Sequence, residues 1–213
     1  GTAAYRVTRD YDAIPPFDPL HDWALLSDYD CDGKEDIFTY SQAGFSVFKN
    51  ISDASGPAFQ MIKYRVNSNY VAPSGAGSIA NLFISQVDVP GIADVDNDGD
   101  LDILTFSLLG SYVEYHKNLS METYGTCDSL LYEVRNKCWG YFAENFSNNS
   151  VTLNVPCQFN VPNPEIGLDG DANGDGSRDL EDTDPERAHA GSTVTPLDLN
   201  GDGVMDMLLG DIS

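Results

Sequence analysis

Aspartates recur at alternate positions in three short segments of the chain, and their spacing is that of a metal-binding loop. In the central copy, GIADVDNDGDLDIL at 91–104, aspartates occupy positions 1, 3, 5 and 9 of a nine-residue loop, and glycine occupies position 6. Ca²⁺ takes about six to eight oxygen ligands. Alternate residues can turn their carboxylates toward one ion, glycine permits the sharp bend, and the carbonyl of position 7 adds a backbone oxygen. The spacing therefore predicts a calcium loop joining two β-strands.

The same pattern recurs in all three copies, with side chains at positions 1, 3, 5 and 9 and the carbonyl of position 7. The predicted ligands are Asp28, Asp30, Asp32, Lys34 and Asp36 in loop one, Asp94, Asp96, Asp98, Asp100 and Asp102 in loop two, and Asp198, Asn200, Asp202, Val204 and Asp206 in loop three. An apolar run follows each loop, and a segment ending in Lys-Asn follows the first two, at 44–50 and 111–118. Because loops and flanks repeat together, they indicate a repeated structural unit.

The segment 171–182 has the longer spacing of an EF-hand-like calcium loop, with ligands at positions 1, 3, 5, 7, 9 and 12. Its predicted ligands are Asp171, Asn173, Asp175, Ser177 through its carbonyl, Asp179 and Asp182. The segment is similar to thrombospondin type 3 and dockerin loops, although no clear helix follows it. We expect a fourth calcium site here, and the alternative is a solvated acidic linker.

These loops and their flanks resemble the FG-GAP/VCBS repeat family, in which each repeat is one four-stranded blade of a β-propeller and the loop joins its first two strands. The resemblance covers most of the chain except about 119–190. It implies an all-β fold, a partial β-propeller of about two and a half blades from a larger propeller with seven or eight blades, carrying a cysteine-containing insertion. The wider pattern is similar to secreted and cell-surface proteins of the Bacteroidota, many of which are type IX secretion substrates.

The repeats divide the chain into five parts. We expect an outer strand and a proline-rich link at 1–22, blade one and a connector at 23–80, blade two at 81–118, the cysteine-containing insertion at 119–190, and the start of blade three at 191–213. Alternating apolar residues at 58–66 predict the outer strand of blade one. A propeller closes with about four to eight blades. We therefore expect open sheet edges, with the remaining blades supplied by a longer parent chain or another chain.

Charge and cysteine content exclude some partners and favour one compartment. With 34 acidic against 11 basic residues, the net charge of −23 argues against nucleic acid as a partner. The sequence contains no run of about 18 apolar residues, so we expect no membrane insertion. Four cysteines beside calcium loops indicate an oxidising, calcium-rich setting, because extracellular loops of this kind bind at about 10⁻⁴–10⁻³ M. We therefore expect a secreted or cell-surface protein.

The cysteine pairing stays open at this level. Cys127, Cys138 and Cys157 are expected to staple the insertion, which is too small for a core of its own. Cys31 stands at position 4 of loop one, with its side chain directed away from the metal. A free, buried thiol and a bridge to the insertion are equally compatible with that position, and four cysteines allow three pairings.

No catalytic arrangement is recognisable, and we expect a non-enzymatic module. The histidines, His21, His116 and His189, are isolated, and no HExxH, GxSxG or glycine-rich phosphate loop is present. Alternation places His116 on a strand surface. The expected function is adhesion or protein interaction at the cell surface, with a protein or glycan ligand. The alternatives are a lectin-like module, with Trp139, Tyr141 and Phe142 as a sugar-stacking platform rather than local core, and an accessory domain of a secreted polysaccharide-degrading enzyme.

Overall fold

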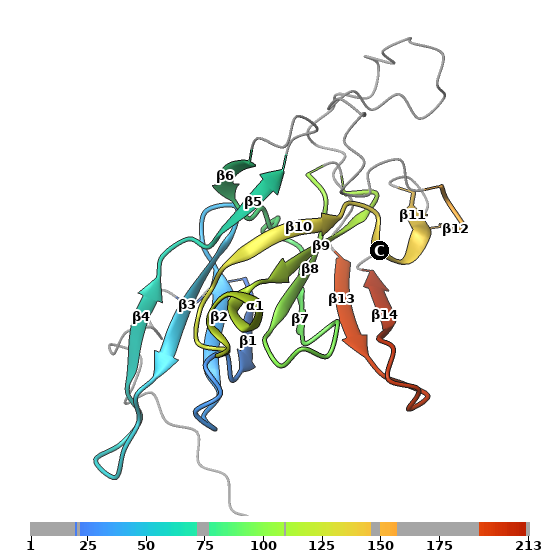
Figure 1. Ribbon diagram of the computed structural model, residues 1–213. Coiled ribbons are helices and arrows are strands. Elements are labelled where there is room, and N and C mark those ends of the chain that lie inside the picture. Colours follow the sequence, from blue (N-terminus) through green and yellow to red (C-terminus); the bar gives the residue numbers. More distant parts are fainter. Residues whose placement is uncertain are drawn as a thin grey trace, which may run out of the picture.

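The computed structural model describes residues 20, 22–71, 77–108, 110–145, 150–156 and 192–211. Most of these residues lie in strands or the turns between them, which confirms the all-β class, and the described strands form four sheets, none of which closes on itself (Figure 1). The predicted loop at 171–182, Cys157 and the segment 1–19 lie outside the described residues. No helix among the described residues is long and apolar enough to cross a membrane.

The first sheet is a four-stranded antiparallel meander that contains the first loop. Its strands are β1 (Ala24–Ser27), β2 (Asp36–Tyr40), β3 (Phe45–Asn50) and β4 (Phe59–Lys63), in that spatial order. The sequence predicts each of them: one before the loop, one after it, one in the aromatic Lys-Asn segment, and one outer strand. β2 and the first half of β3 are buried, as expected for the apolar runs that follow the loop.

The second sheet repeats this meander and adds a hairpin from upstream in the chain. The meander consists of four antiparallel strands in chain order: β7 (Gly91–Ala93), β8 (Asp102–Phe106), β9 (Val113–Asn118) and β10 (Tyr132–Asn136). The added hairpin consists of β5 (Asn67–Val71) and β6 (Gly77–Asn81), and β5 pairs parallel with β10. The structure therefore extends this repeat beyond residue 118, into the stretch that the sequence assigns to the insertion. It also turns the expected connector after blade one into two strands.

Two hairpins complete the described fold. β13 (Ser192–Leu197) and β14 (Asp206–Asp211) form the third loop-bearing hairpin, whereas the 3-10 turn η1 (Trp139–Tyr141) leads into β11 (Phe142–Glu144) and β12 (Val151–Leu153). One short helix, α1 (Ser120–Tyr124), connects β9 to β10. In Figure 1 the loops of the blue β1–β2, green β7–β8 and red β13–β14 hairpins all lie at the lower edge.

The first strands of the three hairpins lie near one another. Val89 N donates a hydrogen bond to Ser192 O at 2.9 Å, and Val194 N donates to Val89 O at 3.0 Å, which joins the entrance of β7 to β13. A side chain at Gly91 would meet Pro196 Cδ at 2.5 Å, so the two strands approach closely only because position 91 is glycine. Residues of β1, β7 and β13 together line one cavity of about 180 Å³.

Two apolar cores lie on opposite faces of the middle sheet. Ile103 of β8 belongs to the core shared with the first sheet, and the next residue, Leu104, belongs to the core shared with β13 and β14. Neighbouring residues of a strand point to opposite faces. Both side chains are fully buried, and each such burial is favourable by about 1.5–3 kcal/mol. The middle sheet is therefore packed on both faces.

His116 is buried, which corrects the prediction that it lies on a strand surface. Its exposure is 0%, its Nδ1 lies 2.8 Å from Ser68 Oγ, and the Tyr70 ring meets it edge-on at 5.7 Å between centroids. Ser68 and Tyr70 belong to β5, in the segment that the sequence predicts as a connector. Alternation along β9 indicated an exposed position, but Ser68 and Tyr70, from another strand of the same sheet, contact the His116 side chain.

Candidate metal centre

Each acidic loop occupies the same place in its hairpin. The residue pairs that flank the loops are Ser27–Asp36, Ala93–Asp102 and Leu197–Asp206, so the position-9 aspartate always begins the second strand. Strand pairing thus fixes both ends of each loop, and the loop residues fold between them.

Backbone geometry and hydrogen bonds also repeat within the loops. The position-1 aspartate accepts hydrogen bonds from the N–H groups of positions 5 and 6, and the position-5 carboxylate accepts one from the N–H of position 7, all at 2.8–3.1 Å. Positions 4 and 6 have left-handed backbone angles in every loop; these residues are Cys31, Gly33, Asn97, Gly99, Gly201 and Gly203. Glycine and asparagine adopt this conformation at low cost, whereas a cysteine there is uncommon. The spacing in the sequence therefore encodes one loop geometry three times.

The position-9 aspartates are buried beneath loops one and two. Asp36 and Asp102 are both 0% exposed. Asp102 Oδ2 accepts from Val95 N at 2.9 Å and Oδ1 accepts from Asn118 N at 2.8 Å, while Asp36 Oδ1 accepts from Asn50 N at 2.7 Å. These bonds tie the loop to the Lys-Asn end of the third strand. Burial raises the pKa of Asp102 to about 7 and raises that of Asp36, against the opposing effect of the backbone N–H donors. A nearby cation would offset this cost of keeping Asp102 ionised.

Carboxylate oxygens gather in loops one and two. Asp28, Asp30 and Asp32 bring one oxygen each within 4.8 Å of the others, and so do Asp94, Asp96 and Asp102. A third group combines Asp96 and Asp98 with Glu122 of α1. All donors are oxygens, which suits a hard cation such as Ca²⁺.

One buried oxygen in loop one tests how well these residues fit a cation. The Asp30 side chain is 5% exposed, and its Oδ1 has no hydrogen-bond partner. A buried, unpaired carboxylate oxygen is costly unless a cation lies nearby. The Lys49 ammonium contacts the other oxygen of Asp30 and leaves Oδ1 unpaired. The residues of loop one therefore fit a bound metal ion, and loop two gathers carboxylates from positions 1, 3 and 9 in place of 1, 3 and 5.

Loop three keeps the turn but not the cluster. Within the described residues, no group of three carboxylates forms at Asp198, Asp202 and Asp206, and Asn200 Nδ2 donates to Asp202 Oδ2 at 3.1 Å. Hydrogen bonds from Gly203, Gly201 and other backbone N–H groups lower the pKa of Asp198. The predicted position-7 residues, Lys34, Asp100 and Val204, donate their N–H to position 5 in all three loops.

Two lysines that the sequence did not single out lie over the acidic loops. Lys49 Nζ contacts Asp30 and lies 3.3 Å from Asp32 Oδ2. Lys117 Nζ contacts Asp96 and lies 2.9 Å from Asp98 Oδ2. Burial acts to lower the pKa of Lys117, but hydrogen bonds to Asp96, Glu122 and Asp98 outweigh it and raise that pKa. The repeated Lys-Asn ending of both third strands was the signal that could have identified them.

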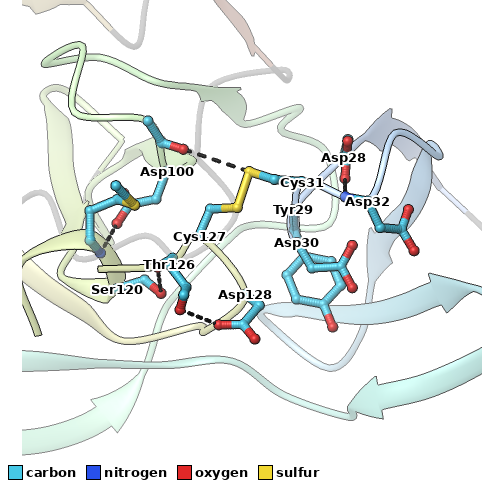
Figure 2. The surroundings of a disulfide bond; sticks show 12 residues. Asp28, Tyr29, Asp30, Cys31, Asp32, Asp100, Ser120, Thr126, Cys127 and Asp128 are labelled. Carbon is cyan, nitrogen blue, oxygen red and sulfur yellow. Dashed lines mark hydrogen bonds between the residues drawn. A yellow bond between two sulfur atoms is a disulfide. The ribbon is translucent and has the colours of Figure 1, made fainter. Parts of the chain in front are cut away.

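A disulfide joins loop one to the segment after α1. Cys31 is bonded to Cys127 with their Cα atoms 6.2 Å apart, so the bridge, not the free buried thiol, is the state of Cys31 (Figure 2). This is the bridge from Cys31 to the insertion, one of the two alternatives that the sequence left open. α1 brings Cys127 to the loop because Ser120 Oγ donates to Thr126 O at 2.6 Å and Asp100 Oδ2 accepts from Met121 N at 2.8 Å. Cys138 is disulfide-bonded as well.

The three aromatic residues proposed for sugar stacking do not share one exposed surface. Phe142 is buried at 3% exposure and Trp139 packs against the same core, whereas Tyr141 is 50% exposed. Trp139 and Phe142 instead line a cavity of about 360 Å³ together with Met207 and Leu209.

Comparison with protein-family models, with curated proteins and with solved structures found no match. The resemblance to FG-GAP/VCBS repeats therefore stays a prediction from the residues of the loops and their flanks. The candidate metal centre rests on the geometry described above.

Proposed function

We propose that the chain is a calcium-stabilised part of an FG-GAP/VCBS-type β-propeller in a secreted or cell-surface protein, with a non-enzymatic role in adhesion or protein interaction. The observation that carries the proposal is one loop geometry repeated in three hairpins, with gathered carboxylates in loops one and two. The chemistry of the donors supports Ca²⁺ as the ion. Oxygen-only ligands on a flexible loop suit Ca²⁺, whereas Mg²⁺ demands near-ideal octahedral geometry.

Electrostatics explain why the ion would be structural. Two carboxylates about 4 Å apart repel each other by about 4 kcal/mol at an effective dielectric constant of about 20. Loop two alone holds five aspartates at 94–102. Lys117 offsets part of this repulsion, but one ammonium faces Asp96, Asp98 and Glu122. A divalent cation would add the missing positive charge and hold the loop closed.

Packing supports further sheets beside β14. Phe38, Leu104 and Leu208 occupy the same position, two residues after the position-9 aspartate. Phe38 and Leu104 are 0% exposed, each in a core shared with the following sheet, whereas Leu208 is 53% exposed. We propose that another blade, from the same polypeptide or from another chain, covers Leu208. The approach of β1, β7 and β13 to one cavity is the arrangement expected of first strands around a propeller axis.

The proposed location rests on the disulfide and the calcium loops. Disulfides such as Cys31–Cys127 persist in oxidising compartments. Loops of this kind in extracellular modules bind calcium at about 10⁻⁴–10⁻³ M, a concentration found outside cells.

Thermal denaturation in calcium, in magnesium and in chelator tests the structural role of the ion. At ten times the dissociation constant each site adds about 1.4 kcal/mol to the free energy of unfolding. The sites in loops one and two would together add about 2.8 kcal/mol, which raises Tm by about 6–11 °C for a chain of this length, and a site in loop three would add to this gain. Asp94→Asn should remove the share of loop two, about 1.4 kcal/mol, and Asp53→Asn, in the exposed β3–β4 turn, should leave the gain unchanged. Identical melting curves in all three buffers would reject calcium stabilisation.

The interaction role needs a separate measurement. The immobilised protein is exposed to purified cell-surface proteins and to a glycan array, in calcium and in chelator. Calcium-dependent binding to proteins supports the proposal. Binding confined to glycans would replace it with the lectin-like alternative, for which Tyr141 is the exposed aromatic residue.

A further inference from the structure

Neighbouring loops touch at corresponding residues. Asn97, at position 4 of loop two, donates a hydrogen bond through Nδ2 to Gly203 O, at position 6 of loop three, at 2.9 Å. Cys31, at position 4 of loop one, places Sγ 3.8 Å from Gly99 O, at position 6 of loop two. Because this sulfur is in a disulfide and carries no hydrogen, the second contact is packing and not a hydrogen bond. The same pair of positions therefore meets twice along the chain.

The backbone of position 4 accounts for this contact. Cys31 and Asn97 have φ angles of 58° and 62°, and the corresponding residue of loop three is Gly201 at 77°. The sequence alternates carboxylates at positions 1, 3 and 5 with other residues between them, so position 4 is free to contact the next loop. Asparagine adopts the left-handed conformation more readily than most residues. Cys31 is held there by its bond to Cys127.

The contacted carbonyl belongs to a peptide unit that is also held at its other end. In loop three, Val204 N donates to Asp202 Oδ1 at 2.8 Å. In loop two, Asp100 N donates to Asp98 Oδ1 at 3.1 Å. The peptide between positions 6 and 7 thus links the position-5 carboxylate of its own loop to the position-4 side chain of the preceding loop. Position 5 and the carbonyl of position 7 are both expected metal ligands.

We propose that the position-4 side chains of loops one and two are positioning groups for the metal site of the next loop, so that the calcium sites are coupled in chain order. Asn97 positions loop three, and the Cys31–Cys127 disulfide positions loop two. The inference rests on the proposed calcium function. Coupling between binding sites is reciprocal, so calcium in loop three also favours the arrangement of Asn97 and with it loop two.

The first test removes the Asn97 amide without straining the backbone. Asn97→Gly gives loop two the residue that loop three already has at position 4. Asn154→Gly is the matched control, because Asn154 is also exposed and left-handed, at φ 59°, but lies after β12. Calcium is titrated into the folded proteins while the amide signals of Gly99 and Gly203 are followed by NMR. Their N–H groups donate to the position-1 aspartates, so each signal reports one loop.

We expect N97G to weaken calcium binding at Gly203 about three- to tenfold, the range for one lost hydrogen bond, and N154G to leave it unchanged. The second test compares C31G/C127S with C31N/C127S. Both lack the disulfide, so any difference arises from the position-4 side chain. C31N should restore at least part of the binding at Gly99 that C31G loses, because asparagine can donate to Gly99 O as Asn97 does to Gly203 O.

The outcomes separate this inference from the function on which it rests. If the wild-type protein gives no saturable shift at Gly33, Gly99 or Gly203, whose N–H groups report loops one, two and three, the calcium function fails and the coupling fails with it. If Gly33 or Gly99 responds but Gly203 does not, the coupling alone is overturned. If calcium binds but N97G matches N154G at Gly203, the coupling alone is overturned. Should the double variants not fold, the comparison of N97G with N154G still decides the proposal.

Discussion

Replacing Lys117 by methionine separates two roles of the lysine that lies over loop two. Its Nζ is 2.9 Å from Asp98 Oδ2 and 2.5 Å from Glu122 Oε1, and it also contacts Asp96. Without calcium the ammonium is the cation that holds these carboxylates together. With calcium it competes for the same oxygens. We therefore expect K117M to destabilise the calcium-free protein and to raise the calcium affinity of loop two.

The structure sets the size of both effects. A hydrogen bond to a charged group contributes about 1.5–3 kcal/mol, and solvent reduces an exposed ion pair to about 1 kcal/mol or less. The Lys117 side chain is 16% exposed but that of Glu122 is 43% exposed, so we expect a total loss of about 2–3 kcal/mol, or about 4–12 °C in Tm, in chelator. If displacing the ammonium costs about 1.4 kcal/mol, removing it raises calcium affinity about tenfold.

Circular dichroism melts in chelator and in millimolar calcium measure the first effect, and isothermal titration calorimetry measures the second. Lys63→Met, an exposed lysine on β4, is the control for the loss of one surface charge. The reasoning is refuted if K117M lowers Tm equally in both buffers, or if its calcium affinity is unchanged or reduced. Either result would mean that the lysine keeps its place in the calcium-bound protein.

Three further predictions concern loop two and the disulfide. In chelator, the pKa of Asp102 is about 7 in the folded protein against 3.8 ordinarily, so the contribution of Asp102 to stability is largest at acid pH and is lost as the pH rises from about 4 to 7. Urea titrations at several pH values should show this fall in stability, and Asp102→Asn should weaken it. In calcium the dependence should reverse, because protons compete with the ion for Asp102. Gly99→Ala should lower stability and calcium affinity by about 1–2 kcal/mol, because alanine is strained at φ +103°. Gly210→Ala is the control, because its added Cβ meets nothing closer than 3.6 Å, and it should be nearly neutral in thermal melts. Equal losses in the two variants would contradict the strain argument. The variant C31N/C127S removes the Cys31–Cys127 bond, which spans 96 residues, and should lower the free energy of unfolding in urea by up to about 4–5 kcal/mol. An unchanged urea midpoint would show that the bond does not constrain the unfolded chain.

Local spacing allowed the loops and their strands to be predicted from the sequence. Ligand positions, left-handed glycines and the strands on either side depend on residues within about ten positions of one another, and the structure places Asp36, Asp102 and Asp206 at the same register position. Spacing along the chain does not decide how closely the side chains gather in space. Loop three has the spacing, but its carboxylates do not gather as those of loops one and two do.

The remaining features depend on contacts between distant residues, which spacing does not encode. β10 pairs with β9 on one side and with β5 on the other, and Ser68 and Tyr70 of β5 contact His116 across the sheet. The lysines that face loops one and two come from β3 and β9, so these charges meet only after the strands have paired.

The sequence by itself determined that three acidic loops would form between strands, because each loop is closed by its own residues. The tertiary structure alone decided that Cys31 bonds Cys127 and that Asn97 reaches Gly203, 106 residues away. The physical reason is that loop geometry is a local property of the backbone, whereas neighbouring loops meet only after whole sheets have packed through their apolar cores.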